Sequence, residues 1–243
     1  ISNFKNYGPI TNNKNSSNTI AMGGIVGLIQ NTTANTINNC ENRGAIKNAP
    51  KTTGHLYAGG LVGWLNKANT SFDNVTNKST VAAHGIHATS GKHCSLGGIV
   101  GCSENATYNI DNASNTAEIS CWSTSGDFKS CCEVGGIIGF INGGTINIGN
   151  KTNISVINSA KITVKRAVDI AAGGIVGKAY GSTLTITNAK NTKNIIQDGW
   201  GNDPSVGNGL GGILGLAYSS EAAGTKNISI SQCINEGAVE KTG

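Results

Sequence analysis

Apolar side chains recur along the chain in short stretches that are set off by glycines and asparagines. The phrase LGGIVG at Leu96–Gly101 returns at Val134–Gly139 as VGGIIG. Its first glycine falls at Gly23, Gly59, Gly97, Gly135, Gly173 and Gly211, which gives steps of 36, 38, 38, 38 and 38 residues. A period this regular indicates a repeat architecture.

An asparagine-rich phrase keeps the same period. It reads INNCENRGAI at Ile37–Ile46 and IDNASNTAEI at Ile110–Ile119, and the chain opens on a further copy at Ile1–Ile10. The last copy, at Ile230–Val239, comes later than the period requires, after an insertion around residues 219–225. The two phrases therefore alternate along nearly the whole chain.

Neither phrase has the 3,4 spacing of an amphipathic helix, and both carry Ile and Val among Gly and Asn, which predicts strands. Strands and turns cannot bury their own apolar face, so neighbouring repeats must stack. We expect one all-β domain over residues 1–243, a right-handed β-solenoid (β-helix) of about six 38-residue coils. Each coil has three short strands, exemplified by YNIDNA, AEISCW and VGGIIGF. Two 19-residue coils per repeat are the alternative, although the two phrases do not superpose under that shift.

Alignment of the copies predicts which positions face inward. Residues two apart in a strand share a face. The predicted inward columns are Ile20, Leu56, Cys94, Cys132 and Ile170; Met22, Ala58, Leu96, Val134, Ala172 and Leu210; Val26, Val62, Val100, Ile138, Val176 and Leu214; Ile1, Ile37, Phe72, Ile110, Ile148, Ile186 and Ile230; and Ile10, Ile46, Val81, Ile119, Ile157, Ile195 and Val239.

One aliphatic column has the opposite parity. It consists of Ile25, Leu61, Ile99, Ile137, Ile175 and Ile213. On a single-sided strand these side chains form an exposed stripe, which is typical of an interface. The alternative is that a loop or another strand covers them.

Asparagines form two further columns. The first is Asn3, Asn39, Asn74, Asn112, Asn150 and Asn188, with Gln232 in the last copy; the second is Asn6, Asn42, Asn77, Asn115, Asn153, Asn191 and Asn235. Stacked amides can bond one another along the axis, and Asn tolerates the left-handed backbone of a sharp corner. We expect a structural role for both columns, with ligand binding as the alternative.

Composition excludes several function classes. The net charge is +5, but only KITVKR, Lys161–Arg166, clusters basic residues, and aromatics are 5%. A nucleic-acid partner is therefore not expected. No apolar run approaches the ~18 residues of a membrane span.

Few residues suggest chemistry. Asp73 and Asp111 occupy equivalent positions in consecutive copies, where two carboxylates can share a proton or bind Ca²⁺, but no third acid joins them. His55, His93 and Cys131 also share a column and are zinc-ligand types, without a visible fourth ligand. We expect no catalytic residue, no metal and no cofactor.

Five of the seven cysteines lie between Cys94 and Cys132. These two share an inward column, so roughly 4.8 Å should separate their strands, within the Cα range of a disulfide. They are a candidate disulfide, or else two buried thiols that act as small apolar side chains. A disulfide between other members of the five is the further alternative. N-glycosylation sequons are dense and include Asn15, Asn31, Asn69, Asn105 and Asn227.

The pairing of GGIVG with a C-x-N-x-G-x-I pattern resembles the GLUG-motif repeat of bacterial and protist surface proteins and adhesins, which also lies beside some IgA-cleaving metalloproteases. The likeness covers nearly the whole chain. It implies a secreted or surface-attached β-solenoid and no catalytic residues; the His-Glu-x-x-His run of a metalloprotease does not occur.

We therefore expect a non-enzymatic structural or adhesive repeat segment, an adhesin stalk or matrix component at the cell surface or outside the cell. The expected partners are neighbouring repeats or copies of itself end to end, because terminal coils without caps expose unpaired edges. A host protein, matrix protein or glycan is a further partner class. The alternatives are a carbohydrate-active β-helix enzyme, favoured by an exposed acid cluster, and a polymerising filament subunit.

Overall fold

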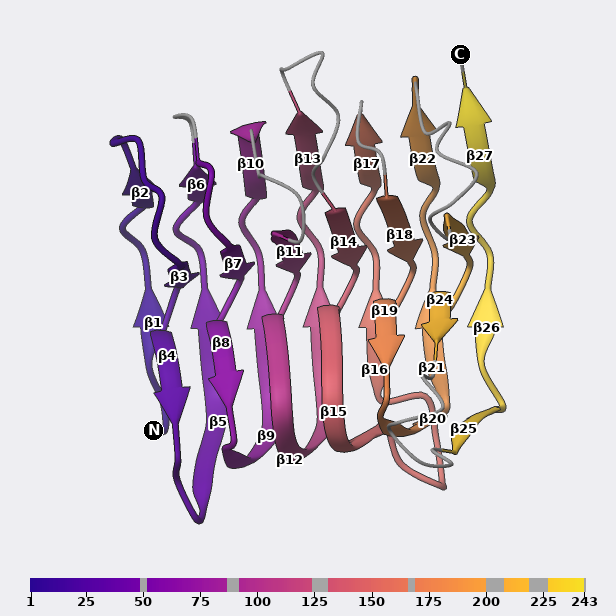
Figure 1. Ribbon diagram of the computed structural model, residues 1–243. Helices are drawn as coiled ribbons and strands as arrows, with labels where there is room; N and C mark the ends of the chain where they lie inside the picture. The colour runs from indigo at the N-terminus through magenta and orange to yellow at the C-terminus, as the bar shows by residue number, and fades with distance from the viewer. Residues whose placement is uncertain are drawn as a thin grey trace.

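The structure, a computed structural model, describes residues 1–48, 52–86, 92–123, 131–165, 169–199, 208–218 and 227–242, and every regular element within these ranges is a β-strand. The strands form three sheets whose members run parallel and side by side (Figure 1). Val100 pairs with Ile138 and Cys94 with Cys132, both 38 residues apart. The chain is therefore a β-solenoid with one coil per 38-residue repeat, and the model with two coils per repeat is excluded.

The three sheets divide the strands as follows. The long sheet has 14 strands: β1 (Lys5–Asn6), β4 (Val26–Gln30), β5 (Asn35–Asn42), β8 (Val62–Asn66), β9 (Asn69–Asn77), β12 (Val100–Asn115), β15 (Ile138–Ile148), β16 (Val156–Asn158), β19 (Val176–Tyr180), β20 (Thr183–Thr187), β21 (Ala189–Asn191), β24 (Leu214–Tyr218), β25 (Ile228–Ser231) and β26 (Ile234–Asn235). The seven-stranded sheet holds β2 (Ile10–Asn12), β6 (Ile46–Asn48), β10 (Val81–Ile86), β13 (Ile119–Ser123), β17 (Ile162–Lys165), β22 (Ile195–Asp198) and β27 (Val239–Thr242). The six-stranded sheet holds β3 (Ile20–Gly23), β7 (Leu56–Gly59), β11 (His93–Gly97), β14 (Cys131–Gly135), β18 (Asp169–Gly173) and β23 (Gly209–Gly211), one strand for each glycine phrase.

The glycine phrase bends in its middle and contributes to two sheets. In the fourth copy, β14 ends at Gly135 and β15 begins at Ile138. A Cβ on Gly136 would lie 2.0 Å from the carbonyl oxygen of Gly174 and 2.4 Å from the amide carbon of Asn158. Only glycine allows this close approach of neighbouring coils.

The bend buries the column that was expected as an exposed aliphatic stripe. Leu61, Ile99, Ile137 and Ile175 have no exposed surface, and Ile25 and Ile213 are partly buried against the same core. The exposed-stripe interpretation is wrong, because parity predicts opposite faces only along a straight strand. At this bend consecutive residues such as Ile137 and Ile138 both point inward.

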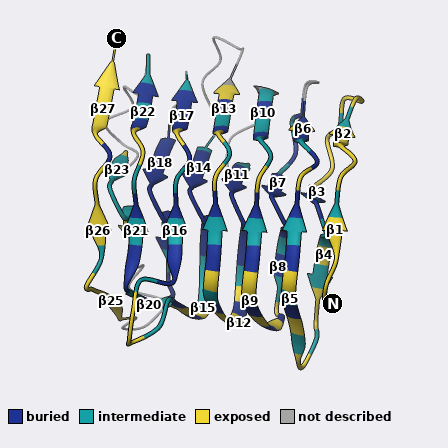
Figure 2. Cartoon of the chain, turned by 180° about the vertical axis from the view of Figure 1, so that it is seen from behind, coloured by how far each residue is buried: buried dark blue, intermediate teal, exposed yellow. Residues whose placement is uncertain are grey.

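The apolar columns pack into two main cores. One lies between the glycine-phrase strands of the long sheet and its asparagine-phrase strands, and contains Val100 and Phe72. The other lies between the six- and seven-stranded sheets and contains Leu96, Ile119 and Cys132. Burial is greatest in the middle coils, while β26 and β27 are mostly exposed (Figure 2). The stacking thus supplies the burial that a single repeat lacks.

The fifth copy departs from the counted register. Ile162, not Ile157, pairs with Ile119 and Ile195 in the seven-stranded sheet. Ile119 and Ile162 are 43 residues apart, whereas the glycine phrases stay 38 apart, as Cys132 and Ile170 show. Five extra residues lie between Ile148 and Val156. They are offset by five fewer residues from Ile162 to Ile170 than from Ile119 to Cys132, 8 against 13. Counting 38 residues per repeat cannot detect an insertion and a deletion that cancel within one repeat.

The corners of each coil adopt the left-handed backbone conformation in two columns. One is the expected asparagine column: Asn3, Asn39, Asn74, Asn112, Asn188 and Gln232 have φ of 46 to 56°. In the fifth copy the left-handed residue is Gly149, with φ 81°, rather than Asn150. The other column, missed in the sequence because its residue types vary, is Asn31, Lys67, Asn105, Gly143 and Gly181.

Candidate functional site

A continuous ladder of side-chain amides runs through the solenoid along its axis. The Nδ2 of each member donates to the Oδ1 of the next: Asn6 to Asn42, Asn42 to Asn77, Asn77 to Asn115, Asn115 to Asn158, Asn158 to Asn191 and Asn191 to Asn235, at 2.8 to 3.0 Å. The five middle members have no exposed surface. In the fifth copy the ladder residue is Asn158; Asn153, expected there by count, is exposed and lies outside the ladder.

Each ladder amide also fixes its own corner. Asn42 Nδ2 donates to the carbonyl oxygen of Gly44 at 2.9 Å, and the Gly44 amide donates to Asn42 Oδ1 at 3.2 Å. The same pair of bonds recurs at Asn158 with Ala160. A buried amide with this many partners has no capacity left for a ligand, so the ladder is structural.

The outer asparagine column is exposed at Asn3, Asn39, Asn74 and Asn112 but buried at Asn188, and it does not form one chain of amides. Asn74 Nδ2 donates to Asn39 Oδ1 at 2.6 Å, but Asn112 donates to Asp73 at 2.8 Å. Asn188 donates to the backbone carbonyl of Asn150 at 2.8 Å. This column therefore fixes the corners, and most of its side chains remain in contact with solvent.

Asp73 and Asp111 are neighbours in register on β9 and β12. Asp111 accepts bonds from Asn150 Nδ2 at 3.1 Å and from the Asn112 backbone amide at 2.8 Å. Burial opposes ionisation of Asp111, but its hydrogen bonds outweigh this and hold its pKa below the usual value. A carboxylate held ionised in this way is a poor general acid.

A second polar cluster lies on the outer side of the six-stranded sheet, and we call it the outer cluster. It comprises His93, Cys131, Glu133, Asp169 and Lys178. His93 Nδ1 lies 2.6 Å from Glu133 Oε1, and Lys178 Nζ lies 3.2 Å from Asp169 Oδ2 and 3.8 Å from Glu133 Oε1. Glu133 is buried, so its charge needs these partners.

Aromatic rings surround the outer cluster. The His93 ring stacks on Phe140 with centroids 4.9 Å apart, and Lys178 Nζ lies 5.8 Å from the Phe140 centroid. In the preceding coils Tyr57 and Trp64 contact each other at 5.3 Å. Outward side chains on the two sides of the glycine bend therefore pack together into a partly desolvated face.

The zinc-ligand column is partly assembled here. His93 pairs with Cys131, which pairs with Asp169 in the next coil, and Glu133 joins His93 and Cys131 with ligand atoms within 4.8 Å of one another. Burial and the carboxylates of Glu133 and Asp169 raise the pKa of Cys131 to about 12. The thiol therefore stays protonated, which disfavours nucleophilic attack. Lys178 supplies the positive charge that a cation would bring.

His55 lies beside this cluster rather than in it. Its ring stacks on His93 with centroids 5.6 Å apart, and its Nε2 is 3.5 Å from Lys92 Nζ. Burial, then the charges of His93 and Lys92, lower the pKa of His55. The pKa values of the two stacked imidazoles are therefore shifted in opposite directions from the ordinary value, down for His55 and up for His93.

The outer cluster predicts a pH dependence of stability. Burial opposes protonation of His93, but the Glu133 carboxylate outweighs it and raises the pKa of His93 above 6.5. A raised folded-state pKa adds stability that is complete below the unfolded value and is lost as pH rises through the folded value. The free energy of unfolding should therefore fall above pH 6.5 in the parent and fall less in His93→Gln.

Denaturant titrations at several pH values check this prediction, with His55→Gln as the matched control. His55 has a lowered pKa, so its effect belongs to the range below about 6.5. Lys178 and Asp169, which also face His93, stay unchanged in both variants. Identical slopes above that pH in the parent and His93→Gln would contradict the assignment.

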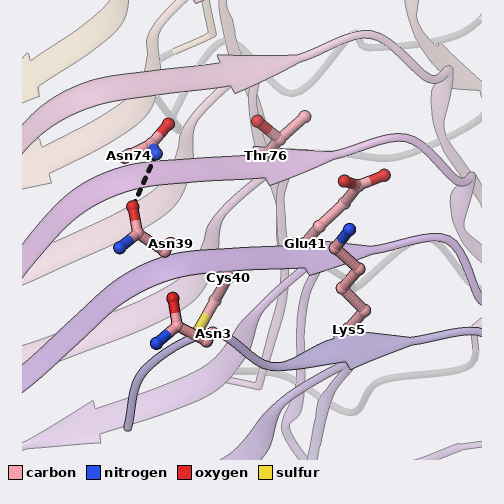
Figure 3. A pocket seen from close by; sticks show the side chains of 7 residues that line it. All are labelled: Asn3, Lys5, Asn39, Cys40, Glu41, Asn74 and Thr76. Atoms are coloured by element: carbon pink, nitrogen blue, oxygen red, sulfur yellow. Dashed lines mark hydrogen bonds between the residues drawn. The ribbon is translucent and has the colours of Figure 1, made fainter.

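A polar pocket of about 450 Å³ opens on the first coils, lined by Asn3, Lys5, Asn39, Cys40, Glu41, Asn74 and Thr76 (Figure 3). Glu41 is its one carboxylate and pairs with Arg43 and, at 3.1 Å, with Lys78. Those ion pairs lower the pKa of Glu41, with the Arg43 hydrogen bond the largest cause. The pocket offers amides, one lysine and one ionised acid, a set suited to binding polar groups rather than to acid–base chemistry.

The candidate Cys94–Cys132 disulfide is not formed in the structure. These residues do pair in register on β11 and β14, but both are free thiols, and Cys121 of β13 contacts each of them. Alignment of the repeat copies could not reveal Cys121 as a neighbour of these two residues. It relates residues along the solenoid axis and not across the core.

Lys178 was missed because it lies beyond the glycine bend on β19, which the alignment does not relate to β14. Glu133 was missed because its column holds Ser95 and Ala171, so no residue type repeats. Extending the His93 column by one copy reaches Asp169.

Among the residues that the structure describes, no helix is long and apolar enough to cross a membrane. No family model, no curated protein and no solved structure matches this chain.

Proposed function

We propose that this chain is a non-enzymatic structural segment of a secreted or cell-surface protein, acting as a rigid stalk or matrix element with an adhesive surface. The observation that carries this proposal is the unbroken axial bonding. Six consecutive amide–amide bonds join coil to coil, beside three parallel sheets whose backbone bonds run in the same direction. Bonding of this kind suits a stiff spacer, because every coil is fixed to both neighbours.

Two observations support a location outside the cell. The sequons at Asn15, Asn31, Asn69, Asn105 and Asn227 are all at exposed positions, where a glycan can be attached. The resemblance to GLUG-motif repeats points the same way. An antibody raised against the chain should label intact cells that produce it, and external protease should remove the signal. Labelling that appears only after permeabilisation would contradict this location.

The proposed partners follow from the parallel pairing of the coils and from the exposed polar side chains. A further coil, from a neighbouring repeat or from another copy, would continue the same parallel pairing that joins Ile195 to Val239. The exposed amides of Asn3, Asn39, Asn74 and Asn112 and the polar pocket around Glu41 suit a glycan or a polar protein surface. A filament subunit is the related alternative, and it uses the same coil-on-coil contact.

The competing enzyme proposal rests on Asp73 and Asp111, the paired carboxylates of consecutive coils. We expect that Asp73→Asn with Asp111→Asn changes no glycan-cleaving activity, because each acid already serves as an acceptor for an amide of the next coil. Reducing-end release from a polysaccharide panel is the measurement, with far-UV circular dichroism as the folding control. Loss of a cleavage activity of the parent, with the fold retained, would overturn the non-enzymatic proposal.

A further inference from the structure

Three cysteine thiols meet in the core between the six- and seven-stranded sheets. Cys121 Sγ on β13 lies 2.8 Å from Cys132 Sγ on β14 and 3.6 Å from Cys94 Sγ on β11. All three side chains are fully buried. The first distance is well inside the contact distance of two non-bonded sulfur atoms, and a disulfide would shorten it to about 2.0 Å.

The surroundings of this cluster are apolar. The same core contains Leu96, Val134 and Ile162, and the column of Cys121 continues to Ala83 and Val164. A thiolate in such a place is costly, whereas a disulfide carries no charge and no unpaired donor.

We propose that Cys121 and Cys132 form a disulfide within one coil, with Cys94 remaining as a buried thiol. The proposal rests on the proposed location outside the cell, where disulfides persist. The bond closes the chain from β13 to β14 around residues 124–130, which lie outside the described residues. It differs from the Cys94–Cys132 pairing, which would have joined two coils.

The oxidant is a low-molecular-weight disulfide. The Cys121 thiolate attacks one of its sulfurs, a mixed disulfide forms, and one small thiolate leaves. The Cys132 thiolate then attacks the Cys121 sulfur of the mixed disulfide, and the second small thiolate leaves. Two protein thiols and one small disulfide thus give one protein disulfide and two small thiols. Because both sulfurs are buried in the finished fold, the exchange takes place while the coil is still open.

The test refolds the full chain in a mixture of reduced and oxidised glutathione and alkylates it in denaturant without reductant. We expect five of the seven thiols to react, because the bond occupies two. Cleavage after Lys, Arg and Glu separates Cys121, on residues 119–129, from Cys131 and Cys132, on residues 130–133. Mass spectrometry should find these two peptides linked.

Two variants assign the bond. Cys94→Ala should keep the linked peptide, and Cys132→Ala should lose it. Seven reactive thiols in the parent, a link through Cys94, or a link that survives in Cys132→Ala would each overturn the proposal. If Cys132→Ala does not fold, the parent and Cys94→Ala still decide between the pairings. A chain that forms the bond in glutathione but is isolated reduced from its cells would contradict the location and leave the bond standing.

Discussion

Val100→Asp should unfold at least the central coils. Val100 has no exposed surface and pairs with Val62 and Ile138 in the middle of the long sheet. Its side chain lies in a core cluster of buried apolar residues. Burying an unpaired carboxylate costs several kcal/mol, comparable with the ~5–15 kcal/mol that stabilises a whole domain. Circular dichroism and denaturant titration should show loss of the cooperative parent transition.

The matched control introduces the same charge at an exposed turn. Lys151→Asp lies outside the strands and should change the free energy of unfolding by about 0.5 kcal/mol or less. A Val100→Asp variant with the melting curve of the parent would mean that the inward face of the solenoid is assigned wrongly.

Asn115→Leu should destabilise the solenoid by about 3 kcal/mol. Leucine has a similar volume but no polar atom, so the Asn77 Nδ2 donor loses its acceptor and Asn158 Oδ1 loses one donor. Both groups are buried, and no water can replace the lost bonds in a fully buried ladder. The free energy of unfolding from urea titration is the measurement.

Asn109→Leu is the control for this substitution. Asn109 lies on the same strand and accepts a hydrogen bond from Asn147 Nδ2 of the next coil at 2.9 Å, but at an exposed position. Water satisfies both groups after the change, so the loss should stay below about 1 kcal/mol. Equal losses at Asn115 and Asn109 would show that burial of the ladder contributes nothing.

The repeat period was sufficient to predict the solenoid, its single-coil period and most inward columns. Leu56, Cys94 and Cys132 align because a parallel sheet places equivalent residues of successive copies side by side. Alignment of the copies also identified both asparagine columns. The alignment is correct wherever the copies have equal length between the aligned positions.

Three features could not be predicted from the sequence pattern and are visible only in the three-dimensional structure. The fifth copy carries two length changes that cancel, so counting selected Asn153 and Ile157 in place of Asn158 and Ile162. The glycine phrase bends, so alternation along it fails at Ile137. Contacts across the coil, such as those of Cys121 with Cys132 and of Lys178 with Glu133, depend on how the sheets face each other, which a one-dimensional pattern does not contain.

The central claim is that the coils stack into one rigid rod, and a single distance distribution tests it. Thr11 and Glu240 are exposed and belong to one column of the seven-stranded sheet, joined through Lys47, Ala82, Ser120, Thr163 and Ile196. Six rungs of about 4.8 Å separate them, or about 29 Å. Spin labels on unnatural amino acids at these two positions, measured by pulsed dipolar spectroscopy, should give one narrow distribution near this value. A broad distribution, or one centred far from it, would contradict the account.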